Sequence, residues 1–250
     1  MTTKNEFNIP IVTLIPPLTL DWETDKATIK KAAMQPTPAD KFYILAAAIQ
    51  NFFNILTHGS KSAPKHPQRS GLLRKVYDEL FPIAHFAKLY FAESNNVLIQ
   101  WFDGNQNFDA TVKYQNECLG RSDIRYLEVT TLQDREDARQ LEELSEEKTI
   151  TTVVESEQQN HLRKIDLFEK ALKKKGGITY PADTALLVYT DEDRFRKCYF
   201  GLQPPEIDKK KDYEAVLNKL SHLLKDFSHV FVYSKHEIYC TWSPKSNQEE

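Results

Sequence analysis

Residues 97–131, VLIQWFDGNQNFDATVKYQNECLGRSDIRYLEVTT, contain three short β-rich segments separated by turn-forming residues. Val97–Phe102 is closed by the turn signal DGN at 103–105, Asn107–Tyr114 alternates apolar and polar side chains, and Ile124–Thr131 is rich in β-branched and aromatic residues. Because short loops join these segments, we expect an antiparallel meander of three strands.

The segments on either side of the meander alternate between helical and extended patterns. Apolar residues at helical spacing predict helices over Leu72–Ala92, with a kink or break at Pro82, and over His161–Lys175 and Tyr213–Phe227. Apolar runs predict strands over Thr184–Thr190, at the centre of the sheet, and over Val230–Tyr233 and Glu237–Trp242. This order of elements predicts an α/β fold in which helices flank a mixed central sheet.

The N-terminal part is expected to form an extension of this domain. Three prolines disfavour a helix in Ile9–Leu20, which reads as an extended arm. Thr37 as N-cap and Pro38 at the first helical position predict a helix that runs to about Thr57. Its apolar stripe needs a surface, either the main domain or a partner: Phe42, Leu45, Ile49, Phe52, Phe53 and Leu56.

Three units follow from these patterns. Residues 1–70 are an N-terminal arm, helix and linker packed on the core, the linker being the polar, proline-containing stretch Gly59–Ser70. Residues 71–245 form the α/β domain, and we expect residues 246–250 to be a disordered tail.

The composition excludes several classes of protein. The chain has 250 residues and a formal net charge of −3, which argues against a protein that coats nucleic acid by bulk charge. No apolar run approaches the length of about 20 residues that a membrane span needs, and residues 1–7 lack the layout of a secretory signal. Three widely separated cysteines suit a reducing compartment and offer no zinc-ribbon spacing, so we expect a cytoplasmic protein.

Two acidic residues stand out because strand interiors are depleted in Asp and Glu. Asp109 lies in the second segment of the meander and Glu128 in the third, so neighbouring strands could place their carboxylates side by side. Together with the backbone carbonyl of Val129, the two carboxylates make a hard oxygen site suited to Mg²⁺. Such a cation polarises a phosphoryl oxygen and activates water, as phosphodiester hydrolysis requires.

With Asp on the second strand and Glu on the third, residues 72–200 resemble the PD-(D/E)XK, or restriction-endonuclease-like, nuclease superfamily. Asp109 matches the Asp of the motif and Glu128 its second acid, whereas Thr130 replaces the usual Lys and Phe108 the usual Pro. The resemblance implies an αβββαβ core and a nuclease, dependent on Mg²⁺ or Mn²⁺, that acts in DNA processing or defence. The alternative is an inactive module on the same fold that binds nucleic acid or a protein.

The missing lysine needs a replacement if the chain is active. Lys113 shares the face of Asp109 but lies four residues further on, about 13 Å along the strand, which is too far. Superfamily members are known to relocate this lysine to the following helix, where Lys164, Lys170 and Lys174 are the candidates. By analogy we expect Lys170, at the centre of the helix, to stabilise charge while Thr130 orients water.

Other charged residues complete the expectations. An acid from the first helix often joins such sites, and Glu79 is the candidate, although a solvated helix acid is the simpler interpretation. Seven acids against two arginines make residues 134–147 acidic, whereas residues 161–175 carry six Lys or Arg against two acids. The basic helix is either a solvated face or a nucleic-acid patch made of Arg163, Lys164, Lys170, Lys173 and Lys174. A third hypothesis is that the N-terminal and acidic helices dock a protein partner.

Overall fold

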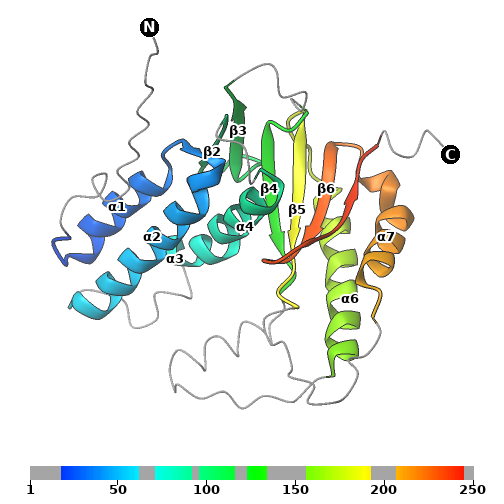
Figure 1. Ribbon diagram of the computed structural model, residues 1–250, viewed down its shortest axis with the longest axis horizontal. Helices are drawn as coiled ribbons and strands as arrows, with labels where there is room; N and C mark the ends of the chain where they lie inside the picture. The colour runs from blue at the N-terminus through cyan, green and yellow to red at the C-terminus, as the bar shows by residue number, and fades with distance from the viewer. Residues whose placement is uncertain are drawn as a thin grey trace, which may run out of the picture.

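The computed structural model describes residues 18–61, 71–91, 96–115, 123–133, 156–192 and 207–244, which form three layers with a sheet in the middle (Figure 1). Seven strands lie side by side in the order in which they occur in the chain. The strands are β1 Thr37–Pro38, β2 Val97–Trp101, β3 Ala110–Tyr114, β4 Tyr126–Thr131, β5 Thr184–Tyr189, β6 Phe227–Tyr233 and β7 Ile238–Trp242.

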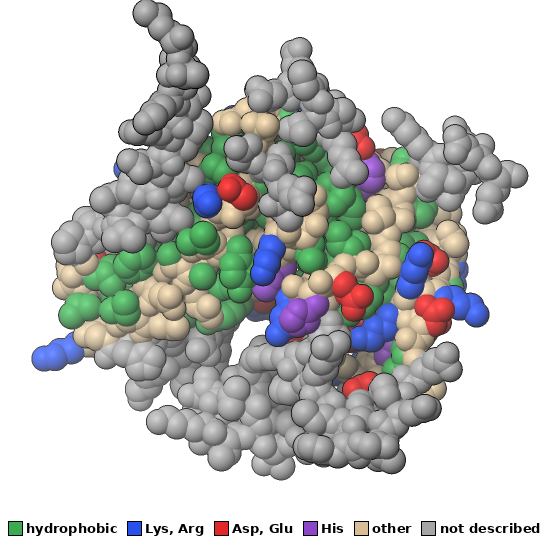
Figure 2. All heavy atoms as spheres, viewed as in Figure 1, with side chains coloured by type: hydrophobic (Ala, Val, Ile, Leu, Met, Phe, Trp, Pro, Cys, Tyr) green, Lys and Arg blue, Asp and Glu red, His purple; other side chains and the backbone are tan. Residues whose placement is uncertain are grey.

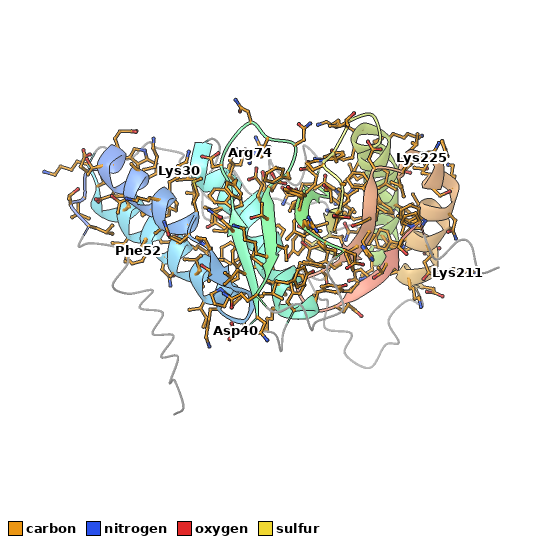
Figure 3. The ribbon with its side chains drawn as sticks, turned by 90° about the horizontal axis from the view of Figure 1, so that it is seen from above. Lys30, Asp40, Phe52, Arg74, Lys211 and Lys225 are labelled. Atoms are coloured by element: carbon orange, nitrogen blue, oxygen red, sulfur yellow. The ribbon has the colours of Figure 1, made fainter. Side chains whose placement is uncertain are left out.

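Helices cover both faces of this sheet. Seen from above, one group lies at one side of the sheet and the other group at the opposite side (Figure 3). The first group is α1 Trp22–Ala33, α2 Ala39–Gly59, α3 Gly71–Lys75, the π-helical turn η2 Val76–Leu80 and α4 Phe81–Tyr90. The second group is α6 Glu157–Lys175, α7 Lys209–Leu220 and the 3₁₀ turn η4 Ser221–Leu223.

The strand directions confirm the expected mixed sheet. Strands β2, β3 and β4 form the predicted antiparallel meander, with Ile99 opposite Val112 and Ala110 opposite Leu127. Strands β4, β5 and β6 are parallel, and β7 returns antiparallel to β6. Strand β5 lies between β4 and β6 and is buried through almost its whole length, as its continuous apolar run predicts.

Each face of the sheet has its own hydrophobic core. Successive residues of one strand point to opposite faces, so Leu187 joins the core under α1–α4 while Leu186 joins the core under α6 and α7. The apolar stripe of α2 is buried in the first of these cores, with Phe42 and Ile49 fully enclosed. The stripe therefore packs on the domain.

The N-terminal region contains a helix that the sequence patterns did not predict. Helix α1 begins after Asp21, whose side chain accepts a hydrogen bond from the backbone N–H of Thr24, and it ends beside Lys30 and Lys31. Acids in the first turn and lysines in the last turn suit the helix dipole. The Lys30 ammonium reaches Asp103 in the turn after β2 at 2.6 Å, and so does that of Lys75, also at 2.6 Å.

Two expected details of the helices are corrected. Thr37 does not cap α2 but pairs with Ile99 in the short edge strand β1. The following residue, Pro38, has no backbone N–H, which an edge strand tolerates because one of its sides has no partner strand. The helix predicted over Leu72–Ala92 is interrupted before Pro82 by the π-helical turn η2. A π-helical turn rotates the side chains of its residues relative to an uninterrupted α-helix, and one of those residues is Glu79.

Several predicted segments lie outside the described residues: most of the arm Ile9–Leu20, most of the linker Gly59–Ser70, the acidic stretch 134–147 and the tail 246–250. Within the part of the chain that the structure describes, no helix is both long and apolar enough to cross a membrane.

Candidate functional site

Asp109 and Glu128 meet where β3 begins beside β4. The last pair of the β3–β4 ladder is Ala110 opposite Leu127, and Asp109 lies just before β3, where its backbone N–H donates to the carbonyl of the same Leu127 at 2.8 Å. Asp109 is therefore not inside a strand, contrary to what the sequence predicted. The charge of Glu128, the residue after Leu127, nevertheless raises the pKa of Asp109, which places the two carboxylates close together.

The Asp109 side chain continues the sheet beyond the end of β3. Its Oδ2 accepts a hydrogen bond from the backbone N–H of Val129 at 2.7 Å. In a strand the N–H and C=O of one residue point to the same side, so the Val129 carbonyl also faces the Asp109 side of β4. The carbonyl therefore lies where the hydrogen-bond ladder between β3 and β4 has ended.

A lysine completes this arrangement. The Lys175 ammonium donates a short hydrogen bond to Glu128 Oε1, and both side chains are more than four-fifths buried. Lys175 is the last residue of α6, and Gly176 follows because the helix end lies tightly against η4: a Cβ on Gly176 would fall 2.7 Å from the Cβ of Leu223. This close approach holds the end of α6 and its lysine in place.

Two more polar side chains border the acidic pair. Glu79, from η2, accepts a hydrogen bond from the Trp101 indole N–H at 3.1 Å, and burial raises its pKa. The hydroxyl of Tyr180 is buried and has no hydrogen-bond partner among the described residues. Burial and the charges of Glu128 and Asp109 raise the pKa of Tyr180, which places its hydroxyl within electrostatic reach of both carboxylates.

The pKa of Asp109 shows how much negative charge the site concentrates. Burial, then the neighbouring charges of Glu128 and Glu79, raise it from the usual 3.8 to about 7, against the opposing effects of the Val129 N–H and Lys175. The Asp109 carboxyl therefore changes protonation state near neutral pH. Such a shifted carboxyl beside two further acids is typical of a site that binds a cation or exchanges protons.

Of the other two predicted site residues, Thr130 lies beside Glu128 and Lys170 does not. Thr130 shares the face of Glu128 and is partly exposed, so its hydroxyl can hold a water molecule beside the pair. Lys170 is exposed and is not the lysine at Glu128. It precedes Lys175 by five residues, which is about 140° around the helix, so the two side chains leave α6 in different directions.

Sequence reasoning missed Lys175 and Tyr180. Lys175 closes the run KKK at 173–175, and only the packing of the helix end decides which of its members points inward. Tyr180 lies in the connection before β5, where no periodicity marks a side chain as buried. Both residues flank Gly176-Gly177, and a double glycine at a helix end was the available signal that the chain turns there.

The predicted basic patch on α6 does not form one surface. Lys164 is fully buried, where its ammonium contacts the Leu132 carbonyl at 2.6 Å and Asp191 at 2.8 Å. Arg163 donates to Asn160, and Lys173 is ion-paired with Glu169. Lys170 and Lys174 remain exposed.

Asp109 and Glu128 are the residues that would hold a cation at this site. Within the described ranges, no group of three or more His, Cys, Asp or Glu side chains is arranged to hold a metal ion. Mg²⁺ is nevertheless bound through one or two carboxylates, with waters and substrate phosphates supplying the rest. Asp109 and Glu128 would be the two carboxylates of such a site; burial, followed by the charges of Glu128 and Glu79, raises the pKa of Asp109, and Lys175 is paired with Glu128.

No family model, curated protein or solved structure matches this chain.

Proposed function

We propose that the chain is a metal-dependent nucleic-acid phosphodiesterase, a nuclease, with a core related to the PD-(D/E)XK fold. The observation that carries this proposal is the proximity of Asp109, just before β3, and Glu128 of β4, which is bound by the ammonium of Lys175. Acid, acid and lysine are the three functional groups of the motif, with the lysine delivered by α6 in place of position 130. The meander β2–β4, the helix α6 and the parallel strand β5 follow the order that this core requires.

Each side chain has a role in the proposed hydrolysis. Asp109, Glu128 and the Val129 carbonyl would hold Mg²⁺ or Mn²⁺, and a bound cation polarises the phosphoryl oxygen and makes bound water more acidic. Thr130 orients the attacking water, which bonds to phosphorus and loses a proton to solvent. The phosphorus–oxygen bond to the leaving sugar then breaks, and that oxygen takes up a proton. Lys175 stabilises the negative charge that gathers on the phosphate oxygens.

Cleavage of labelled oligonucleotides tests this proposal. Single-stranded and duplex DNA and RNA are each incubated with the protein in Mg²⁺ or Mn²⁺, and cutting should occur in at least one case. Glu128→Gln should lower the rate by at least 100-fold, whereas Glu169→Gln, a partly exposed acid on α6 paired with Lys173 and Lys219, should leave it unchanged. Cutting that persists in Glu128→Gln or in excess EDTA contradicts the proposal.

A second candidate is a non-catalytic module on the same fold. Two observations favour it. Glu128 is already ion-paired with Lys175, and Asp109 already accepts a hydrogen bond from the Val129 N–H at the end of the ladder between β3 and β4. In this case the acids only stabilise the sheet. Such a module binds its partner without cutting and takes up no Mn²⁺ in a calorimetric titration, which separates it from the nuclease.

A further inference from the structure

A row of aromatic rings runs along η2 and α4 and continues onto the end of β5. Tyr77 stacks on Phe81 with ring centroids 6.1 Å apart, Phe81 lies 6.2 Å from His85, and His85 stacks almost parallel on Tyr189 at 5.8 Å. Tyr43 of α2 joins the row from the side, 5.4 Å from His85. Tyr43 and Tyr77 are 36% and 37% exposed, whereas Phe81, His85 and Tyr189 are half-buried.

Positive charges lie among these rings. The Lys88 ammonium is 5.3 Å from the centroid of the Tyr43 ring. Burial, followed by the positive charges of Lys235, Lys88 and His236, lowers the pKa of His85 to about 4. His85 is therefore a neutral ring at physiological pH, and the cations around it are exposed side chains of α4 and of the turn between β6 and β7.

Acidic side chains also lie near these rings, among them Asp78, which follows Tyr77 and is ion-paired with Arg74 at 3.0 Å. Asp40 at the start of α2 is ion-paired with Lys41 at 3.4 Å, and Glu237 is the acid of the turn between β6 and β7. Figure 2 shows histidine, lysine or arginine, and acidic side chains close together near the middle of the face it displays, beside hydrophobic side chains. We call this surface the aromatic–basic patch and define it by Tyr43, Tyr77, Phe81, His85, Lys88 and Lys235.

We propose that the aromatic–basic patch binds single-stranded nucleic acid, with bases stacked on its rings and the sugar-phosphate backbone along its lysines. Aromatic side chains interleaved with cations are how proteins hold single strands without reading their sequence. A duplex keeps its base faces inside its own stack and cannot use the rings, and an acidic peptide would use the lysines alone. The charge and the rings together therefore favour a single strand.

The patch is separate from the candidate nuclease site and goes beyond the function proposed above. Tyr189 lies at the end of β5, three residues beyond Leu186, the β5 partner of Glu128. Its side chain packs with the core under α1–α4, whereas Glu128 faces α6. A strand held at Tyr189 would therefore lie on the face of the sheet opposite to the one that Glu128 occupies.

Fluorescence anisotropy with labelled 15-nucleotide oligo(dT) and oligo(U) in EDTA tests this binding without cleavage. The double variant Lys88→Glu/Lys235→Glu should bind at least tenfold more weakly. Its dependence of log Kd on log salt should be shallower by about 1.4, since each phosphate contact of a single strand contributes about 0.7. The matched control is Lys211→Glu/Lys225→Glu, which makes the same charge change at the α7 side of the molecule (Figure 3) and should stay within twofold of the wild type.

Stacking is tested separately from charge. Tyr43→Ala should weaken binding about tenfold, whereas Tyr43→Trp should keep it, because base stacking on a ring contributes on that scale. A circular dichroism melt confirms that each variant is folded. Glu128→Gln should bind the oligonucleotides as tightly as the wild type does. Binding at the patch can therefore be found when the nuclease proposal fails, and cleavage can be found when binding at the patch fails.

Three results would overturn the proposal: no binding of either oligonucleotide by the wild type, tighter binding of a 15-base-pair duplex, or a loss of affinity as large in the α7 control as in Lys88→Glu/Lys235→Glu. Competition by a poly-glutamate peptide as strong as by unlabelled oligo(dT) would also overturn it, because the patch would then recognise negative charge alone.

Discussion

Asp109 does two things at once. Its backbone N–H makes the last backbone hydrogen bond between β3 and β4, to the carbonyl of Leu127. Its side chain accepts a hydrogen bond from the backbone N–H of Val129, two residues further along β4. A carboxylate that only capped the sheet would gain from ionisation. Burial and two neighbouring acids instead raise the pKa of this one to about 7, a cost to stability that a bound cation would remove.

The cost of ionising Asp109 makes stability depend on pH. The folded protein holds the Asp109 proton up to about pH 7, whereas the usual value is 3.8, so between these values the folded state binds more protons than the unfolded state. Stability from this residue is therefore lost as pH rises through 7. Urea denaturation in EDTA compares the free energy of unfolding of Asp109→Asn with that of the wild type at about pH 5 and at about pH 8. The difference should favour the variant by about 1–3 kcal/mol more at pH 8 than at pH 5, because a tenfold change in proton affinity is worth about 1.4 kcal/mol. An equal difference at both pH values would contradict the assigned environment.

Lys175 can be distinguished from the other lysines of α6 by substitution. Lys175→Met keeps the bulk of the side chain but leaves the Glu128 carboxylate unpaired, so it should lower cleavage at least tenfold and stability by about 1–3 kcal/mol. Lys170→Met, on the exposed face, should change neither quantity by a measurable amount. Cleavage rates and urea midpoints for the two variants provide the comparison. Equal behaviour of both would remove Lys175 from the site.

At the scale of elements, α6 connects two clusters of charge at its two ends. Lys175 ends the helix at the acidic pair, and 14 residues earlier, about 21 Å along the axis, His161 lies buried between two carboxylates. Its Nδ1 is 2.9 Å from Glu192 and its Nε2 3.1 Å from Asp212, so one imidazole joins α6 to the end of β5 and to α7. The Tyr213 hydroxyl also donates to Glu192.

His161 should make this junction sensitive to pH. Burial alone would lower its pKa, but the hydrogen bond and charge of Glu192, followed by those of Asp212, raise it overall. Its contribution is therefore complete below the unfolded value near 6.5 and is lost as pH rises through the higher folded value. His161→Gln should cost about 1–3 kcal/mol at pH 6 and less at pH 9, measured by urea denaturation. A cost that grows with pH would show that the imidazole is neutral in the folded protein.

The elements show what the sequence could and could not reveal. Periodicity located the meander, α6 and the central strand β5, because burial on one or both faces leaves a pattern in the residues themselves. It also predicted that Asp109 and Glu128 lie close together, although Asp109 comes just before β3 and not within it. The inward-pointing lysine depends on how the end of α6 packs against Leu223, and the apolar side chains that α1 buries are few: Trp22, Ile29, Ala32 and Ala33. Neither is encoded in local periodicity.

For the molecule as a whole, the N-terminal helices belong to the main core. The buried side chains of α1 and α2 form one continuous cluster with those of α4 and the sheet, and Trp22 packs on Phe53 within it. Without these helices the apolar residues on one face of β2 and β3 would be exposed to water. A partner-binding role for the α2 stripe would require it to leave this core.

The core can be tested by removing or altering α2. A chain that lacks residues 1–70 should lose the cooperative thermal transition in circular dichroism, because one sheet face is uncovered. Ile49→Ser, in the buried stripe, should lower stability by about 3 kcal/mol, whereas Ile55→Ser, on the outer side of the same helix and 54% exposed, should cost little. A truncated chain that still unfolds cooperatively would show that residues 71–245 fold independently.

The claim on which the proposed function depends is that Asp109 and Glu128 together hold a divalent cation. Calorimetric titration with Mn²⁺ measures this directly and needs no knowledge of the substrate. We expect one Mn²⁺ to bind per chain at about pH 8. The affinity should be at least tenfold weaker at pH 6, because Asp109 must first lose its proton. Neither Asp109→Asn nor Glu128→Gln should bind Mn²⁺. Binding that is absent from the wild type, or unchanged in both variants, would contradict it.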